Sequence, residues 1–146
     1  MKETGGCLCG AVRFEVTGRP GSVIYCHCRM CQKMSGSVVT TWAEFAPEAF
    51  SVTQGEVARH QSSTQVERGF CAHCGSTLLA RRAPGWEEEE DYVAIATGAF
   101  DRPETFPPDD AHAGIESQVP WLKIDDHLPR KTTMDAMGYD AEKDRQ

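Results

Sequence analysis

Apolar and polar residues alternate over short stretches of this chain, a pattern typical of half-buried β-strands. In residues 11–17 the apolar side chains of Val12, Phe14 and Val16 alternate with polar neighbours. Further strands are predicted over 22–26, 36–42, 51–55, 57–63, 64–71, 76–82 and 91–98. The fourth and fifth of these form a predicted hairpin. Because helical periodicity is almost absent, the sequence predicts a mainly β protein.

Helical structure is predicted only in single turns. Residues 29–34 accommodate one or two turns before Ser35 and Gly36 stop them, and residues 46–50 can form one more. A proline-rich stretch after the last strand, around residues 103–108, predicts an irregular connection. Short strands and single turns leave sandwich, barrel and metal-pinned sheets equally compatible with the pattern.

The last third of the chain supplies scattered apolar anchors to a core. They are Ile115, Val119, Trp121, Leu122 and Ile124. We expect Trp42 and Trp121 to lie in the core or in the wall of a pocket. The acidic run 87–91 is interpreted as a solvated loop tip. The tail from Arg130 is polar, and we expect it to be loosely ordered.

Composition narrows the function classes. At 146 residues the chain predicts one domain, and 15 Lys and Arg against 22 Asp and Glu give a net charge of −7. An acidic chain without a basic patch argues against non-specific nucleic-acid binding. The first residues lack the apolar core of a signal peptide, and no apolar run approaches the roughly 20 residues that cross a bilayer. A cytoplasmic protein without membrane contact is therefore expected.

Seven cysteines are the most informative feature of the composition. An odd number leaves one thiol outside any complete set of disulfides. In a reducing compartment, grouped cysteines are metal ligands or catalytic thiols more often than bridges. The sequence therefore favours metal binding over a disulfide scaffold.

Four of the cysteines form two pairs, each followed by glycine. CLCG contains Cys7 and Cys9, and CAHCG contains Cys71 and Cys74. Zinc knuckles bend the backbone sharply, and glycine tolerates the positive φ that such a bend requires. Four thiolates complete a structural zinc site. We predict that these cysteines bind one zinc ion and join the N-terminus to the middle of the chain.

The other three cysteines, Cys26, Cys28 and Cys31, lie within the stretch CHCRMC. Three interpretations remain open. The three thiolates could bind a second zinc ion with one open position, as catalytic zinc sites do. A histidine could close the site instead, the candidates being His60, His112 and His127. The cluster could also consist of free, oxidisable thiols.

An open three-cysteine site has a definite chemical preference. Zinc with three thiolates carries a formal charge of −1, so it is a weaker Lewis acid than zinc bound by three histidines. Such a metal suits a soft fourth ligand, and an incoming thiol is the obvious candidate. Coordination deprotonates the thiol and holds it ready to attack a carbonyl carbon. Thiol addition to an aldehyde, or its reversal, is the reaction class that follows.

Four stretches together resemble a known family. GGCLCGAVRFEV, CHCRMCQKMSG, FCAHCGSTL and PWLKIDDHLPR are similar to the glutathione-dependent formaldehyde-activating enzyme and centromere protein V family. The resemblance covers about residues 5–130, so residues 1–130 are expected to form the zinc domain and residues 131–146 a polar C-terminal tail. It implies a zinc-containing β-tent fold of small antiparallel sheets in a single domain.

The resemblance also implies ligand sets and an activity. The family's structural zinc positions correspond to Cys7, Cys9, Cys71 and Cys74, and its catalytic-type zinc positions to Cys26, Cys28 and Cys31. Two zinc ions per chain are thus expected. The implied reaction is a carbon–sulfur lyase reaction, in which formaldehyde and glutathione give S-hydroxymethylglutathione. Glutathione or a similar thiol would be the cosubstrate and a small carbonyl compound the second partner.

Other candidate residues follow from the chemistry of such a substrate. Glutathione carries two carboxylates, so Arg29 and Lys33 beside the cysteine cluster are candidate binding residues, as are Arg81 and Arg82. His27 is a candidate proton shuttle, because histidine titrates in the right range. Two other functions stay open: an adaptor module in which both zinc ions are structural, and a carrier that binds a thiol adduct without accelerating its formation.

Overall fold

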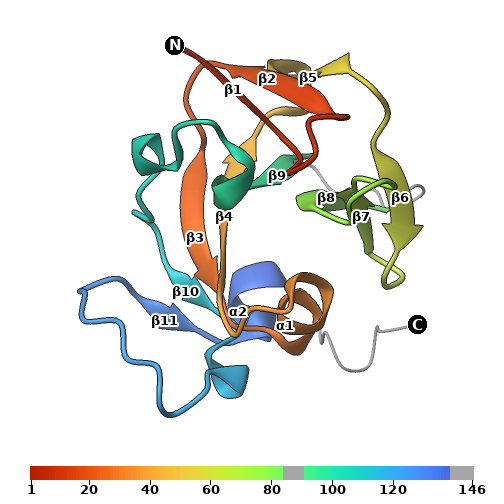
Figure 1. Ribbon diagram of the computed structural model, residues 1–146. Coiled ribbons are helices and arrows are strands. Elements are labelled where there is room, and N and C mark those ends of the chain that lie inside the picture. The colour runs from red at the N-terminus through yellow and green to blue at the C-terminus, as the bar shows by residue number, and fades with distance from the viewer. Residues whose placement is uncertain (84–90, 139–146) are drawn as a thin grey trace.

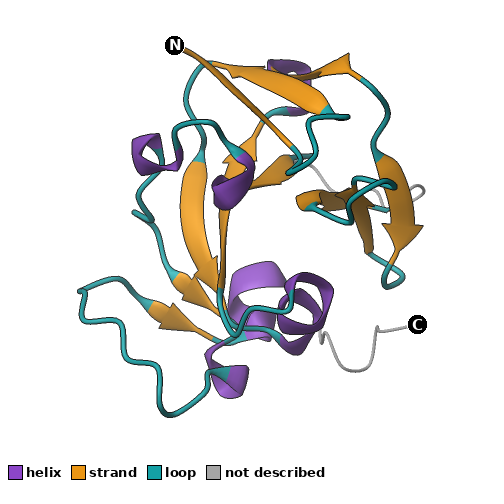
Figure 2. Ribbon diagram, in the orientation of Figure 1, coloured by secondary structure: helices purple, strands orange, loops and turns teal. Residues whose placement is uncertain are grey.

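The computed structural model describes residues 1–83 and 91–138. The chain forms one small domain made mainly of strands in two sheets (Figures 1 and 2). The smaller sheet has the order β1–β2–β5, with bounds Lys2–Gly6, Arg13–Thr17 and Phe50–Gln54. Both of its pairings are antiparallel. The mainly β fold predicted from the alternation is confirmed.

The larger sheet has the strand order β11–β10–β3–β4–β9–β8–β7–β6. Its strands are β3 (Ser22–Cys26), β4 (Thr40–Phe45), β6 (Ala58–Gln61), β7 (Val66–Phe70), β8 (Thr77–Arg82), β9 (Val93–Ala96), β10 (His112–Ala113) and β11 (Arg130–Lys131). Pairing is antiparallel from β3 through to β6, and the predicted hairpin is β6 with β7. The short strand β10 lies parallel to both β3 and β11.

Helices are short and lie at the lower end of the larger sheet in Figure 2 or in its connections. The two α-helices are α1 (Arg29–Ser35) and α2 (Thr133–Met137). The 3-10 turns are η1 (Pro47–Ala49), η2 (Thr97–Ala99), η3 (Pro103–Thr105) and η4 (Ile115–Ser117). α1 and η1 confirm the two predicted helical turns. Helix α1 ends at the left-handed Gly36, and residues 36–39 form bends. Strand β4 therefore begins at Thr40, four residues later than expected.

The central strands of the larger sheet are buried on both faces. Ala43, Phe45 and Ile95 face the smaller sheet and form a core with Phe14. Alternate residues point the other way, where Trp42 packs with the cysteines of CHCRMC. One face of the larger sheet thus packs against the smaller sheet, and the other face packs against the second cysteine cluster.

Strand β1 was not predicted, because its sequence KETGG has no apolar alternation. Its inward positions are Glu3, which forms an ion pair with Arg102, and Gly5. A Cβ atom on Gly5 would lie 2.4 Å from the carbonyl oxygen of Ala99 and from the ring of Phe14. Close packing at a glycine and a buried carboxylate paired with the exposed Arg102 replace the apolar pattern that marks other strands.

Two expectations about the C-terminal third were wrong. Trp42 is buried as expected, but Trp121 is 71% exposed, because burial alternates along the irregular stretch 121–129 and Trp121 falls on the outward side. The segment from Arg130 is not loosely ordered over its described part, since it forms β11 and α2. Residues 139–146, and the predicted acidic loop tip apart from Asp91, lie outside the described residues.

Candidate metal centres and active-site cavity

Cys7, Cys9, Cys71 and Cys74 meet at one point, although the two pairs lie far apart in the sequence. Their Sγ atoms all lie within 4.8 Å of one another. Cys7 Sγ is 3.6 Å from Cys9 Sγ, and Cys9 Sγ is 3.8 Å from Cys71 Sγ. Zinc bound tetrahedrally by thiolates at about 2.3 Å sets its sulfurs about 3.8 Å apart. The four residues therefore fit a structural zinc ion.

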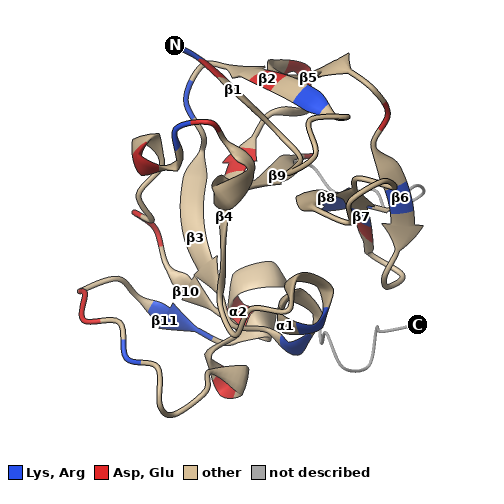
Figure 3. Ribbon diagram, in the orientation of Figure 1, with Lys and Arg blue, Asp and Glu red and all other residues tan. Residues whose placement is uncertain are grey.

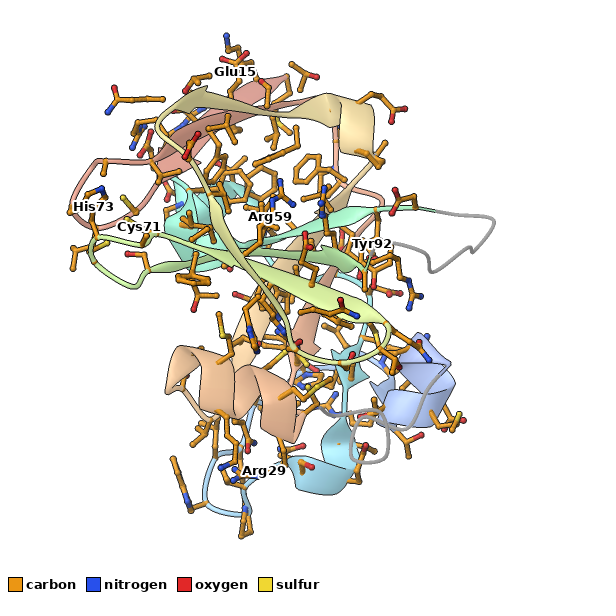
Figure 4. The ribbon with its side chains drawn as sticks, turned by 90° about the vertical axis from the view of Figure 1, so that its right-hand side faces the viewer. Glu15, Arg29, Arg59, Cys71, His73 and Tyr92 are labelled. Atoms are coloured by element: carbon orange, nitrogen blue, oxygen red, sulfur yellow. The ribbon has the colours of Figure 1, made fainter. Side chains whose placement is uncertain are left out.

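The backbone around these cysteines has the form expected of two knuckles. Gly10 and Gly75 both have positive φ, at 80° and 78°. The amide of Val12 donates a hydrogen bond of 3.2 Å to the Cys7 sulfur. Leu8 N donates to Ser76 Oγ at 2.9 Å, which joins the two knuckles directly. His73 is an exposed part of this turn, at the side of the molecule beside Cys71 (Figure 4).

Cys26, Cys28 and Cys31 form a second cluster, which is buried. Cys26 ends β3, Cys28 is the N-cap of α1, and Cys31 lies in its first turn. Cys26 Sγ is 3.4 Å from Cys28 Sγ and 3.3 Å from Cys31 Sγ. The spacing, slightly shorter than in a tetrahedral zinc site, is compatible with three thiolates on one metal ion.

No histidine closes this cluster among residues 1–83 and 91–138, where the three cysteines are the whole group of candidate ligands at this point. His60 and His127 are exposed. His112 is buried, but both of its ring nitrogens are engaged by other side chains. Of the three interpretations left open by the sequence, closure by a histidine therefore has no support among the described residues, whereas the open zinc site and the free thiols both agree with this cluster.

His27 belongs to a buried hydrogen-bonded chain. Its Nε2 lies 2.9 Å from His112 Nδ1, and His112 Nε2 lies 2.9 Å from Asp126 Oδ2. Burial lowers the pKa of His27, with His112 and Arg130 acting in the same direction, so this ring is neutral at pH 7. The hydrogen bond from His112 lowers the pKa of Asp126 to about 2.

The chain of hydrogen bonds agrees with one arrangement of the ring protons. In it, the Asp126 carboxylate accepts from His112 Nε2–H, and His112 Nδ1 accepts in turn from His27 Nε2–H. His27 is not part of the cavity wall described below. The ring, placed between two cysteine ligands but directed to His112, holds the turn from β3 into α1.

A cavity of about 50 Å³ opens beside the second cluster. Its wall contains all three cysteines and is otherwise mostly apolar, with Trp42 from β4 and Met137 from α2. A volume of this size holds about three to five water molecules. The three cysteines therefore border a small, largely apolar space.

Close packing fixes one edge of this cavity at Gly114. Its φ is 69°, and a Cβ atom placed on it would lie 2.7 Å from the backbone nitrogen of Cys28 and 2.9 Å from Cys28 Cβ. The loop after β10 can thus approach the metal-binding turn only without a side chain at this position.

The predicted substrate-binding residues lie at different distances from the cavity. Arg29 and Lys33 are exposed on α1, at the lower end of the molecule in Figures 3 and 4, and neither is part of the cavity wall. Arg81 contributes to the wall and donates from Nε to Glu67 at 2.8 Å. The Arg82 guanidinium lies 5.4 Å from the centre of the Tyr92 ring.

Sequence reasoning missed the most buried basic residue of the site. Arg68 on β7 is only 2% exposed, belongs to the cavity wall, and places Nη1 3.4 Å from Cys31 Sγ. Hydrogen bonds from Cys26 and Cys28 hold the pKa of Cys31 well below its usual range, and Arg68 acts in the same direction. The sequence contained one signal for this residue, namely a basic side chain within the predicted strand that leads into CAHCG.

Comparison with known proteins gives the family. The model of the family described as glutathione-dependent formaldehyde-activating enzyme matches residues 2–114, most of the chain. The chain belongs to the glutathione-dependent formaldehyde-activating enzyme family. The match covers all seven cysteines, and the resemblance noted in the sequence is confirmed.

Individual relatives agree with this membership. A Halomonas elongata protein, named provisionally as a glutathione-dependent formaldehyde-activating enzyme, is 30% identical over 135 residues, covering 86% of this chain and 82% of its own. An uncharacterized lyase of Schizosaccharomyces pombe is 32% identical over 81 residues, covering 51% of this chain and 53% of its own. A crystal structure of a Rhodobacter sphaeroides protein shares the fold, with a TM-score of 0.54 and 19% identity over 87% of this chain and 98% of that one.

Proposed function

We propose that this family member is a zinc-dependent carbon–sulfur lyase-like enzyme. It would join a small thiol such as glutathione to formaldehyde or another small carbonyl compound, or release the thiol from the adduct. The observation that carries the proposal is the buried Cys26, Cys28 and Cys31 cluster, which has three convergent sulfurs and borders a cavity. The names of the family and of two relatives support the reaction class.

The residues present fit zinc at both clusters, so we expect two zinc ions per chain. Cys7, Cys9, Cys71 and Cys74 would hold the first, and Cys26, Cys28 and Cys31 the second. At the second cluster, bound zinc would lower the pKa of an incoming thiol and hold its sulfur as a thiolate.

The cavity sets what the protein's own residues do in this reaction. Its volume of about 50 Å³ accommodates a thiol sulfur and a one-carbon carbonyl group, while the body of a tripeptide would stay outside. Trp42 and Met137 would surround the reacting atoms with apolar walls, which strengthens electrostatic interactions inside the cavity. Arg29, Lys33 and Arg81 remain candidates for binding the exposed carboxylates of the thiol.

The test compares rates with the uncatalysed addition. Formaldehyde and glutathione combine without an enzyme, so adduct formation is followed by exchange NMR with and without the zinc-loaded protein. We expect a rate increase that Cys31→Ala abolishes, while Cys31→Ala keeps the fold and the first zinc ion. Binding of the adduct without any rate increase would instead identify the protein as a carrier, and two zinc ions without affinity for any small thiol would favour an adaptor module.

A further inference from the structure

Arg68 is a buried cation in a cavity that is otherwise mostly apolar. It lies on β7 opposite Ala80 of β8, and Ala80 in turn lies opposite Ala94 of β9. Both alanines belong to the same cavity wall. Because these two neighbouring strands carry only methyl groups there, the long arginine side chain has room to extend over them toward Cys31.

Contacts with Cys31 and Ser62 hold the guanidinium in place. Nη1 lies 3.4 Å from Cys31 Sγ, and Nε donates to Ser62 Oγ at 3.2 Å. The Ser62 hydroxyl also lies 3.3 Å from the carbonyl oxygen of Val66, so the turn between β6 and β7 fixes its position. Because the guanidinium is rigid and planar, contacts at Nε and Nη1 fix the orientation of the whole group.

The charge of the loaded site explains why a cation is needed there. Zinc and three thiolates sum to −1, and an incoming thiolate would bring the sum to −2 inside a small buried cavity. Burying uncompensated charge is costly, whereas a cation within hydrogen-bond distance reduces that cost. Zinc, the four thiolates and Arg68 together sum to −1. The cavity wall also contains one carboxyl group, on Glu44, and a second guanidinium, on Arg81.

We propose that Arg68 is a catalytic residue that allows the cavity to accept the substrate thiol as a thiolate, and that it stabilises the negative charge which moves to the carbonyl oxygen during addition. This role rests on the proposed function. In the addition, the S–H bond of the thiol breaks and its proton goes to water. A sulfur lone pair forms the C–S bond, the π pair of the carbonyl moves to oxygen, and that oxygen takes a proton from water.

The addition needs no oxidant or reductant, because the adduct contains all the atoms of the thiol and the carbonyl compound. A preorganised cation near the developing alkoxide acts as an oxyanion-stabilising group. Arg68 therefore contributes both to thiol affinity and to the rate of addition, unlike the exposed Arg29 and Lys33, which could contribute only to binding.

Calorimetric titration of glutathione into the zinc-loaded protein tests this role without measuring turnover. Wild type is expected to release about one proton per glutathione bound at pH 7, as judged from buffers of different ionisation heat. Arg68→Met should weaken binding roughly ten- to a hundredfold, the range for a hydrogen bond to a charged group. Arg68→Lys, which keeps the charge but not the fork, should fall between the two.

The matched control is Arg19→Met in the turn between β2 and β3. Arg19 is exposed and lies outside the cavity wall, so this variant should bind glutathione as wild type does. Metal analysis must show two zinc ions in every variant compared.

Three outcomes would overturn the proposal. Equal glutathione affinity of wild type and Arg68→Met, with both zinc ions present, would remove the role of Arg68 alone. Loss of the second zinc ion from Arg68→Met and Arg68→Lys alike would make Arg68 a part of the metal site's framework instead. A wild-type protein with two zinc ions and no affinity for glutathione would overturn the proposed function, and the role of Arg68 with it.

Discussion

At the level of single residues, the second cysteine cluster depends on the absence of a side chain at Gly114. Gly114 and Cys28 are separated by 86 positions in the sequence, yet a single methyl group on Gly114 would overlap the backbone of Cys28. Neither residue alone indicates this dependence. The glycine has to adopt a left-handed conformation and leave space at the same time.

Replacement of Gly114 tests this packing. We expect Gly114→Ala to lower the free energy of unfolding by about 1–3 kcal/mol and to weaken zinc binding at the second cluster, because both the positive φ and the contact with Cys28 oppose a side chain. Zinc content and urea unfolding measure the two effects. The control is Gly98→Ala, where a Cβ atom meets nothing within 4 Å. Equal behaviour of the two variants would contradict the packing argument.

Glu44 gives a prediction about pH. Burial raises the pKa of this carboxyl group above 4.5, with Asp110 acting in the same direction and Ser22 against it. The folded state therefore binds more protons than the unfolded state between pH 4.5 and the folded pKa, and stability falls as pH rises through that window. Glu44→Gln removes this cost, so its stability relative to wild type should increase as pH rises from 4.5 to 7.

Urea unfolding of both proteins over that pH range measures the difference, in which effects common to both cancel. Glu48→Gln, at an exposed position on η1, is the control. An advantage of Glu44→Gln that stayed constant with pH would show that ionisation of Glu44 is not its cause.

At the scale of elements, α2 joins the cavity to the end of the described chain. The helix has only five residues, so its ends decide its stability. Thr132 accepts a hydrogen bond from Asp135 N at 3.1 Å, and the Glu116 carboxylate accepts from Thr133 N at 3.0 Å. Met137 of the same helix belongs to the cavity wall.

Loss of the cap should therefore be felt at the cavity. Thr132→Ala is expected to cost about 1 kcal/mol and to increase amide hydrogen exchange in α2, because the helix loses its N-cap acceptor. Thr132→Ser keeps a hydroxyl and should behave as wild type. Exchange measured by mass spectrometry separates the two, and unchanged exchange in Thr132→Ala would show that packing of Met137 and Ala136 suffices to hold the helix.

At the scale of the whole molecule, the sequence predicted what is encoded locally. The alternation at Val12, Phe14 and Val16 predicted a strand, and the glycines after Cys9 and Cys74 predicted knuckles with positive φ. Both cysteine groupings were predicted correctly as groups. The ligands within each pair or triplet are close in sequence, and the two distant pairs were joined because a structural zinc site needs four thiolates. The zinc ions themselves and the cytoplasmic location stay predictions.

Features set by distant pairings could not be predicted in the same way. Arg68 lies on β7, and Cys31 lies on α1, which follows β3. The two residues meet because β7 and β3 belong to one sheet, whose strand order the sequence does not specify. His112 meets His27 through the parallel pairing of β10 with β3, and a strand of two residues is too short to be predicted from sequence.

Across the described residues, 1–83 and 91–138, no helix has the length and apolar character needed to cross a membrane.

The proposed reaction requires that the Cys26, Cys28 and Cys31 site binds zinc and keeps a fourth position for a substrate thiol. Crystal structures of the zinc-loaded protein with and without glutathione, recorded at the zinc absorption edge, test it most directly. We predict two zinc ions per chain, the second bound by these three sulfurs at about 2.3 Å and by the glutathione sulfur as fourth ligand. A protein side chain in that fourth position in both crystals, or zinc at the first cluster alone, would contradict the account.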